Sequence, residues 1–152
     1  MIRDFWVKNY LSISDKQELS FVAKEPASEL VVEVSENVFL YKLGILYGSN
    51  ASGKSNMLLA MNEIFRMMIQ PKSDAGKKIS GYMPFVLSTD KPTEMHVSFY
   101  AAGIRYDYDV SFNGRCILKE VLNYYPNKAK SLFYERNFVS DNVQANIKFG
   151  TG

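Results

Sequence analysis

The sequence predicts an α/β fold in which one helix packs on a mixed sheet beside an antiparallel β subdomain. Residues 38–41 and 43–47 form a nearly continuous apolar run, which is typical of a buried parallel strand. Apolar residues then recur at helical spacing over residues 53–69. In the last third of the chain, apolar and polar side chains alternate, as they do in antiparallel strands.

The N-terminal region contains several further strand-like segments. Aromatic and β-branched residues mix with polar ones in segment 2–14, and the same composition continues in segments 19–22, 30–34 and 38–41. We therefore expect a β-rich region to lead into the apolar run at residues 43–47.

The helix predicted over residues 53–69 should pack its apolar face against the sheet, and Pro71 should mark its end. A separate methionine-rich groove for a partner is the alternative. The apolar face comprises Met57, Leu58, Met61, Ile64, Phe65 and Met68. The opposite face carries Asn56, Asn62, Glu63 and Arg66.

Four strands are predicted in the last third of the chain. Asn113 and Gly114 form the strongest hairpin signal, since this dipeptide favours a tight turn. Beyond Arg136 the sequence is polar, and no further element is expected. The predicted strands cover residues 94–100, 104–112, 116–125 and 131–135.

Composition sets broad limits on the class of protein. The 152 residues suit a single domain, residues 1–152. The net charge of +2 neither requires nor excludes a nucleic-acid partner. The single cysteine, Cys116, cannot close an intrachain disulfide, which fits a reducing compartment. No apolar run has the length of a membrane span, so we expect a soluble, cytoplasmic protein without a membrane partner.

Residues 72–80 form a polar, locally basic segment that we expect to be a flexible, solvated loop. Contact between this loop and a nucleic acid is the alternative.

The main candidate site is a phosphate-binding P-loop. Its two glycines let the backbone approach phosphate oxygens closely, and the amides of the loop and of the following helix point at the anion. Lys54 should contact the β- and γ-phosphates as the catalytic cation, and the Ser55 hydroxyl should bind Mg²⁺. The motif consists of Gly48, Ser49, Asn50, Ala51, Ser52, Gly53, Lys54 and Ser55, with Asn56 as a further nucleotide-binding residue.

At this point the chain resembles the ABC-type ATPases of the RecF, chromosome-maintenance and OLD (overcoming lysogenisation defect) kind, and bacterial defence-type AAA ATPases. The resemblance rests on residues 5–10 (Phe-Trp-Val-Lys-Asn-Tyr), on residues 48–56 and, more loosely, on segments 120–122 and 133–136. It implies ATP and Mg²⁺ as ligands, ATPase activity, homodimerisation of the full-length protein and a DNA-directed or defence activity. Nucleic acid stays open as a partner.

Two family motifs are missing from the chain. No apolar strand ends in Asp-Glu, the pair that holds Mg²⁺ and activates water, and the Ser-Gly-Gly signature is absent. Asp107 and Asp109 lie in an alternating strand, where they look like its solvent face rather than metal ligands. We therefore expect a truncated N-terminal lobe that hydrolyses ATP weakly or not at all by itself.

Two other functions remain open at this stage: a non-hydrolysing nucleotide- or DNA-binding module, and a small-molecule P-loop kinase. The remaining candidate residues are weaker. His96 suits a packing or surface position, and Cys116 is expected to be a small buried hydrophobe. The C-terminal tyrosines suit cross-strand packing better than base stacking. The resemblance implies that Lys8, Asn9 or Arg3 could approach the base or ribose. Gln17 and Gln70 match the family's γ-phosphate-sensing glutamine poorly.

Overall fold

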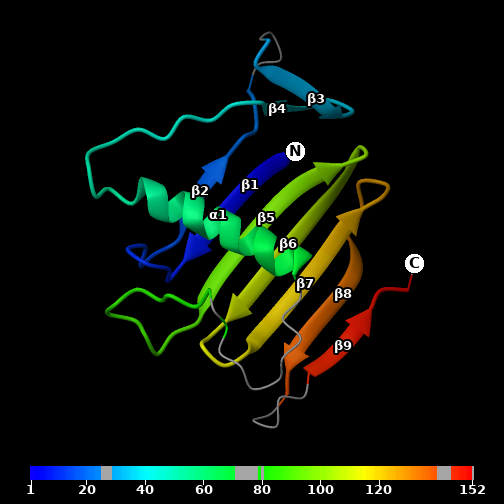
Figure 1. Cartoon of the computed structure of the whole chain (residues 1–152). Helices are drawn as coiled ribbons and strands as arrows, with labels where there is room; N and C mark the ends of the chain where they lie inside the picture. Colours follow the sequence, from blue (N-terminus) through cyan, green and yellow to red (C-terminus); the bar gives the residue numbers. More distant parts are fainter. Residues whose placement is uncertain (25–28, 71–78, 80, 140–144, 152) are drawn as a thin grey trace.

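The computed structural model describes residues 1–24, 29–70, 79, 81–139 and 145–151. Within this part of the chain, one helix, α1 (Lys54–Ile69), crosses one face of a seven-stranded sheet (Figure 1). A separate two-stranded sheet lies beyond one end of this large sheet. The strands are β1 (Ile2–Lys8), β2 (Gln17–Ser20), β3 (Val31–Ser35), β4 (Val38–Tyr41), β5 (Thr93–Ala101), β6 (Ile104–Phe112), β7 (Ile117–Tyr125), β8 (Ser131–Phe138) and β9 (Ala145–Phe149).

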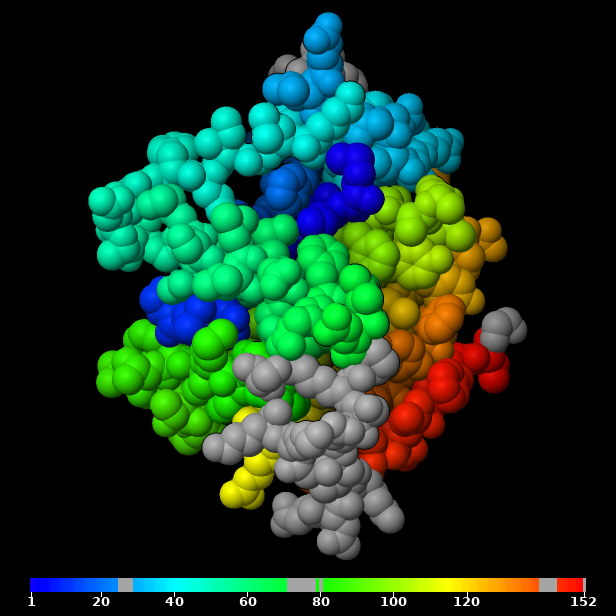
Figure 2. Space-filling model, in the orientation of Figure 1, coloured from blue at the N-terminus to red at the C-terminus, as the bar shows by residue number. Residues whose placement is uncertain are grey.

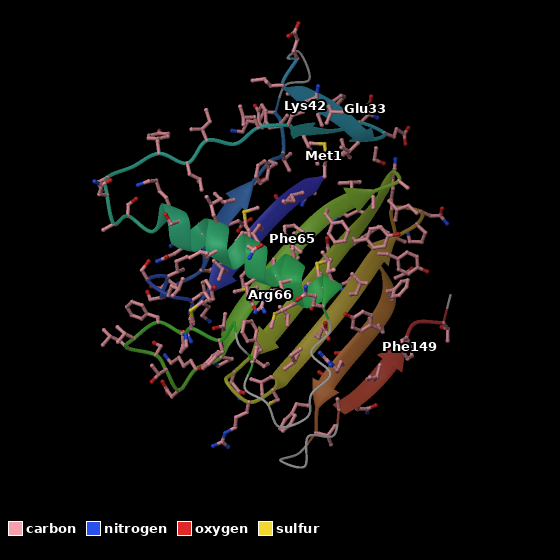
Figure 3. The ribbon with its side chains drawn as sticks, viewed as in Figure 1. Met1, Glu33, Lys42, Phe65, Arg66 and Phe149 are labelled. Atoms are coloured by element: carbon pink, nitrogen blue, oxygen red, sulfur yellow. The ribbon has the colours of Figure 1, made fainter. Side chains whose placement is uncertain are left out.

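The large sheet has the order β2-β1-β5-β6-β7-β8-β9, and each of its neighbouring pairs is antiparallel. β5 to β9 follow one another as a meander, and β1 lies between β2 and β5. The small sheet is the antiparallel hairpin β3–β4. Figure 3 places Met1, Glu33 and Lys42 at the end of the molecule where β1 begins and this hairpin lies. The antiparallel strands predicted for the last third of the chain are thus confirmed, but they belong to the same sheet that packs against α1 rather than to a subdomain beside it. The mixed sheet predicted beneath the helix is wrong, because every neighbouring pair of strands in the described sheet is antiparallel.

The buried parallel strand predicted over residues 38–41 and 43–47 is wrong. Residues 38–41 form β4, which pairs with β3 in the antiparallel sense. Segment 43–47 has no regular structure, and Leu43, Ile45 and Tyr47 are 57%, 76% and 91% exposed. A buried parallel strand needs neighbours that cover its edges and faces. None of the described strands pairs with this segment, so Leu43, Ile45 and Tyr47 stay largely exposed. The segment, cyan in Figure 2, stands off the body of the molecule.

The helix prediction is confirmed, but its buried face is rotated from the expected one. Period-two alternation along the strands turns the inner side chains toward α1, where they form the core. Leu58 is 56% exposed, while Phe65 and Met68 are only partly covered. The inner strand residues are Phe5, Val7, Met95, Val97, Tyr108, Val110 and Phe112, and they face Met57, Ala60, Ile64 and Met67 of α1.

Glu63, predicted on the polar face, is instead buried at 6% exposure. Arg66, one turn along the helix, donates hydrogen bonds of 2.7 Å to both oxygens of its carboxylate. The chain returns over this ion pair at Gly81, where a Cβ would lie 1.7 Å from a carboxylate oxygen of Glu63. Burial and the neighbouring Glu63 charge raise the pKa of Tyr10. A buried charge is tolerated here because its partner lies on the same helix.

The C-terminal hairpins match the sequence with one addition. Asn113 closes the β6–β7 turn, since its side-chain oxygen accepts the amides of Arg115 and Cys116 at 2.8 and 2.9 Å. Cys116 is partly exposed rather than buried. β9 was not expected; it pairs with β8 although all of its side chains are exposed. Cross-strand stacking of Tyr106 on Tyr124 confirms the packing role predicted for those tyrosines.

The predicted loop 72–80 lies outside the described residues except for Ile79, which is buried in the core. In the described part of the chain, no helix is long and apolar enough to cross a membrane.

Candidate functional site

The P-loop joins the exposed segment 43–47 to the N-terminus of α1. Gly48 and Gly53 adopt positive φ values of 154° and 90°, and Ala51 lies in the left-handed region at 64°. Gly53 is the N-cap of α1 and leaves the first helical amides without a side-chain cap. A helix start of this kind presents free N–H groups and the positive end of the helix dipole to an anion.

The Lys54 ammonium folds back over the loop. Its Nζ donates to the carbonyl oxygens of Gly48 and Ser49 at 3.0 and 2.6 Å, and to Ser52 Oγ at 3.3 Å. The cation is therefore held at the centre of the curve that the loop describes. An anion entering the loop would exchange these neutral acceptors for charged ones, which form stronger hydrogen bonds with an ammonium group.

A cavity of about 640 Å³ opens beside the loop. Its size lies within the range of small-molecule and cofactor sites, roughly 300–1,000 Å³. One wall comes from the P-loop and the start of α1, and the other comes from the connection between β1 and β2 and from β2 itself. The lining residues are Ser12, Ile13, Ser14, Asp15, Gln17, Glu18, Leu19, Leu46, Tyr47, Gly48, Ser49, Ser52, Gly53, Lys54 and Met57.

The predicted site residues divide into two groups. The structure places Gly48, Ser49, Ser52, Gly53 and Lys54 in the cavity wall. The other four belong to the same loop and helix start but do not line the cavity, and they are Asn50, Ala51, Ser55 and Asn56. Asn56 has a different contact: its side-chain amide donates to Ser12 Oγ at 2.7 Å.

The residues considered for base or ribose contact do not reach the cavity. Asn9 is 2% exposed, and its side-chain amide donates to the carbonyl oxygens of Ser88, Lys91 and Pro92. It therefore fixes the approach to β5. Lys8 pairs with Glu94 at 3.1 Å, and Arg3 pairs with Asp4. Of the two candidate glutamines, Gln17 lines the cavity, whereas Gln70 caps the C-terminal end of α1, away from the P-loop.

Comparison with known proteins identifies the family. Residues 44–151 match the model of the family described as "AAA domain, putative AbiEii toxin, Type IV TA system". The match begins just before the P-loop and extends through β9. The chain belongs to this AAA-domain family. Searches of curated proteins and of solved structures gave no significant match.

Outside its P-loop, the AAA domain carries a second polar cluster on the face of the sheet opposite α1. His96 Nδ1 lies 2.7 Å from Asp109 Oδ1, and the His96 ring stacks on Trp6 at 5.8 Å between ring centroids. Asp107, predicted on the solvent face, is buried at 7% exposure by Arg105 and Tyr125. No group of three or more His, Cys, Asp or Glu side chains in the described part of the chain could hold a metal ion.

The position of the β1–β2 connection in the wall of the AAA domain's cavity was not predictable from a sequence motif. Asn9 and Leu11 adopt φ values of 54° and 50°, which reverse the chain and bring Ser12 against the start of α1. Neither residue is glycine, the strongest marker of a positive φ, although asparagine also tolerates this region. The mostly polar residues at 14–18, which follow the strand-like segment, were the one available indication.

Proposed function

We propose that this AAA domain binds ATP with Mg²⁺ at residues 48–55. The observation that carries the proposal is the Lys54 ammonium, held within a glycine-bounded loop at an uncapped helix start. The donor set fits a polyphosphate, since it combines a cation, backbone amides and hydroxyl groups. The loop also fits: a Cβ on Gly48 would lie 3.1 Å from Ser52 Oγ, so a side chain there would crowd the curve.

Each P-loop residue would have a distinct task. The Lys54 ammonium would neutralise charge that develops on the γ-phosphate, and the amides of residues 50–55 would donate to phosphate oxygens. The Ser55 hydroxyl would bind Mg²⁺, and its exposed position leaves it accessible. When bound, Mg²⁺ and ATP supply a transferable phosphoryl group and the charge that balances it.

We further propose an ABC-type ATPase of the RecF, chromosome-maintenance and OLD kind. In the described part of the chain, β1 to β4 precede the P-loop, and a strand-rich region before the P-loop is what the resemblance implies. In the intact protein, two such lobes would close over nucleotide and hydrolyse it to drive a DNA-directed or defence activity. The toxin and type IV TA system in the family's description favour the defence role.

For this chain alone, we propose nucleotide binding with weak or no hydrolysis. Hydrolysis needs a group that holds Mg²⁺ and activates water. The acids in the described cavity wall are Asp15, in the connection between β1 and β2, and Glu18, on the edge strand β2. Glu18 is also paired with Lys16 at 2.9 Å.

The test is calorimetric titration with ATP and Mg²⁺, together with a turnover assay. We expect the parent to bind, and Lys54→Ala and Ser55→Ala to bind at least tenfold more weakly. Lys8→Ala is the control, because it removes an exposed lysine that pairs with Glu94 outside the cavity. Equal binding by parent and Lys54→Ala would overturn the proposed site. Robust turnover that Lys54→Ala abolishes would overturn the non-hydrolysing role of the isolated chain.

A further inference from the structure

Asp15 introduces a negative charge into a cavity built for an anion. It lines the same cavity as Lys54, on the opposite wall. Its Oδ2 accepts a hydrogen bond of 3.0 Å from Ser14 Oγ, and its side chain is exposed. Among the described residues, no lysine or arginine lies within ion-pair distance of Asp15, whereas the neighbouring acid Glu18 is paired with Lys16.

The wall that carries Asp15 is fixed relative to the P-loop. Tyr10 and Ile13 exchange two backbone hydrogen bonds of 2.9 and 2.8 Å, and the Asn9 amide donates to Ser14 at 3.2 Å. The Leu11 amide donates to Met83 across the molecule at 2.7 Å. With the Asn56 bond to Ser12, these contacts hold the turn in one position. Asp15 therefore contacts the part of a ligand that lies in the half of the cavity away from Lys54.

The chemistry of Asp15 suits one half of a nucleotide and opposes the other. A carboxylate beside phosphates repels them, and this repulsion grows where water is excluded. A carboxylate accepts hydrogen bonds from hydroxyl or amino groups, and acidic side chains in dinucleotide-binding folds contact ribose hydroxyls in this way. With Lys54 at the phosphate end, the nucleoside half is the part of the ligand that offers such donors.

We propose that Asp15 determines specificity by accepting a hydrogen bond from the nucleoside half of the bound nucleotide. The donor is a ribose hydroxyl or the amino group of the base. This inference rests on the proposed function, since it requires the triphosphate to lie at the P-loop. It assigns to Asp15 the preference for a nucleotide over a bare polyphosphate.

The experiment compares the affinities of inorganic triphosphate and ATP, both with Mg²⁺, by calorimetry. Asp15→Ala and Asp15→Asn should weaken ATP binding by about tenfold or more, the usual loss for a charged hydrogen bond. Triphosphate binding should stay unchanged or become tighter. Glu18→Gln is the matched control, because it removes a lining carboxylate that is already paired, and it should leave the ratio of the two affinities as in the parent.

Two further ligands identify the donor. If the effect of Asp15→Ala disappears with 2′,3′-dideoxy-ATP, the donor is a ribose hydroxyl; if it disappears with purine riboside triphosphate, the donor is the amino group. Persistence of the effect with both ligands overturns the inference. So does an equal loss for ATP and triphosphate, which would indicate a metal or phosphate role, and so does no loss at all. If the parent binds neither triphosphate nor ATP, the proposed function fails as well. If triphosphate binding depends on Lys54 but one of these contradicting results is found for Asp15, only the inference has failed.

Discussion

Asn56 Nδ2 lies 2.7 Å from Ser12 Oγ, so the first turn of α1 is tied to the turn between β1 and β2 across 44 residues of sequence. The same Ser12 Oγ lies 3.4 Å from where a Cβ on Gly53 would be. The β1–β2 turn is thus joined through Ser12 to the start of the helix beside the P-loop.

We expect Asn56→Ala and Ser12→Ala each to lower the free energy of unfolding by about 0.5–1.5 kcal/mol, the usual net worth of one hydrogen bond. Because both changes remove the same bond, the double variant should lose less than the sum of the two. Urea denaturation of the four proteins measures this coupling. Additive losses would mean that the bond contributes nothing to stability.

Ala51 adopts a φ of 64°, in a region that costs a residue with a Cβ about 1–2 kcal/mol. Ala51→Gly should relieve this cost, although the more flexible unfolded chain offsets part of it. We expect a gain in stability of up to about 1 kcal/mol, measured by thermal or chemical unfolding. Ala102→Gly is the matched control, since Ala102 has a φ of 50° in the β5–β6 turn. Both should stabilise the fold, and only Ala51→Gly should change nucleotide affinity.

Gly81→Ala should destabilise the protein, because the new Cβ would lie 1.7 Å from the buried Glu63 carboxylate. Moving that carboxylate disturbs its hydrogen bonds with Arg66, and we expect a loss of about 1–3 kcal/mol. Gly114→Ala is the milder comparison, since its Cβ would approach the Tyr82 ring at 3.1 Å. An equal stability of Gly81→Ala and parent would show that the chain moves at this position without cost.

The Asp107 carboxylate should make the stability depend on pH in the acid range. Burial opposes its ionisation, but hydrogen bonds from Arg105, Ser98 and Tyr125 outweigh burial and lower its pKa. The unfolded chain therefore takes up the proton first, and the contribution of Asp107 is complete above the unfolded pKa of about 3.9. It is lost as the pH falls through the lower folded pKa.

Asp107→Asn tests this dependence. The difference in unfolding free energy between parent and Asp107→Asn should be largest near neutral pH and should shrink below about pH 4. Asp90→Asn, which changes an exposed aspartate, serves as the control. A difference that stays constant over the whole acid range would contradict the lowered pKa.

The elements with strong local patterns were predictable from the sequence. The helix, the hairpin at residues 113–114 and the alternating strands of the last third follow from side-chain periodicity and turn chemistry, both of which act over a few residues. The P-loop was recognisable because its glycines, lysine and serine have the required spacing and lie between an apolar run and an amphipathic helix.

Features set by distant contacts were not predictable. The apolar run at residues 43–47 has the composition of a buried strand, but composition does not supply the neighbours that such a strand needs. The sequence places Glu63 on the polar face of the helix, but in the structure the distant residue Gly81 covers it. The role of Ser12 depends on a turn with positive φ at Asn9 and Leu11, where no glycine marked it.

The exposed segment 43–47 also bears on how the protein behaves in concentrated solution. Its backbone is unpaired among the described residues, and Ile45 and Tyr47 expose 76% and 91% of their surface. A short apolar stretch with free amides and carbonyls is a template for intermolecular β-pairing and aggregation. Molecules that associate through this segment would block the P-loop cavity, which Leu46 and Tyr47 line. Self-association and loss of ligand binding should therefore increase together as the protein concentration rises. A single charge placed within the stretch, as in Ile45→Lys, would act as a gatekeeper against both.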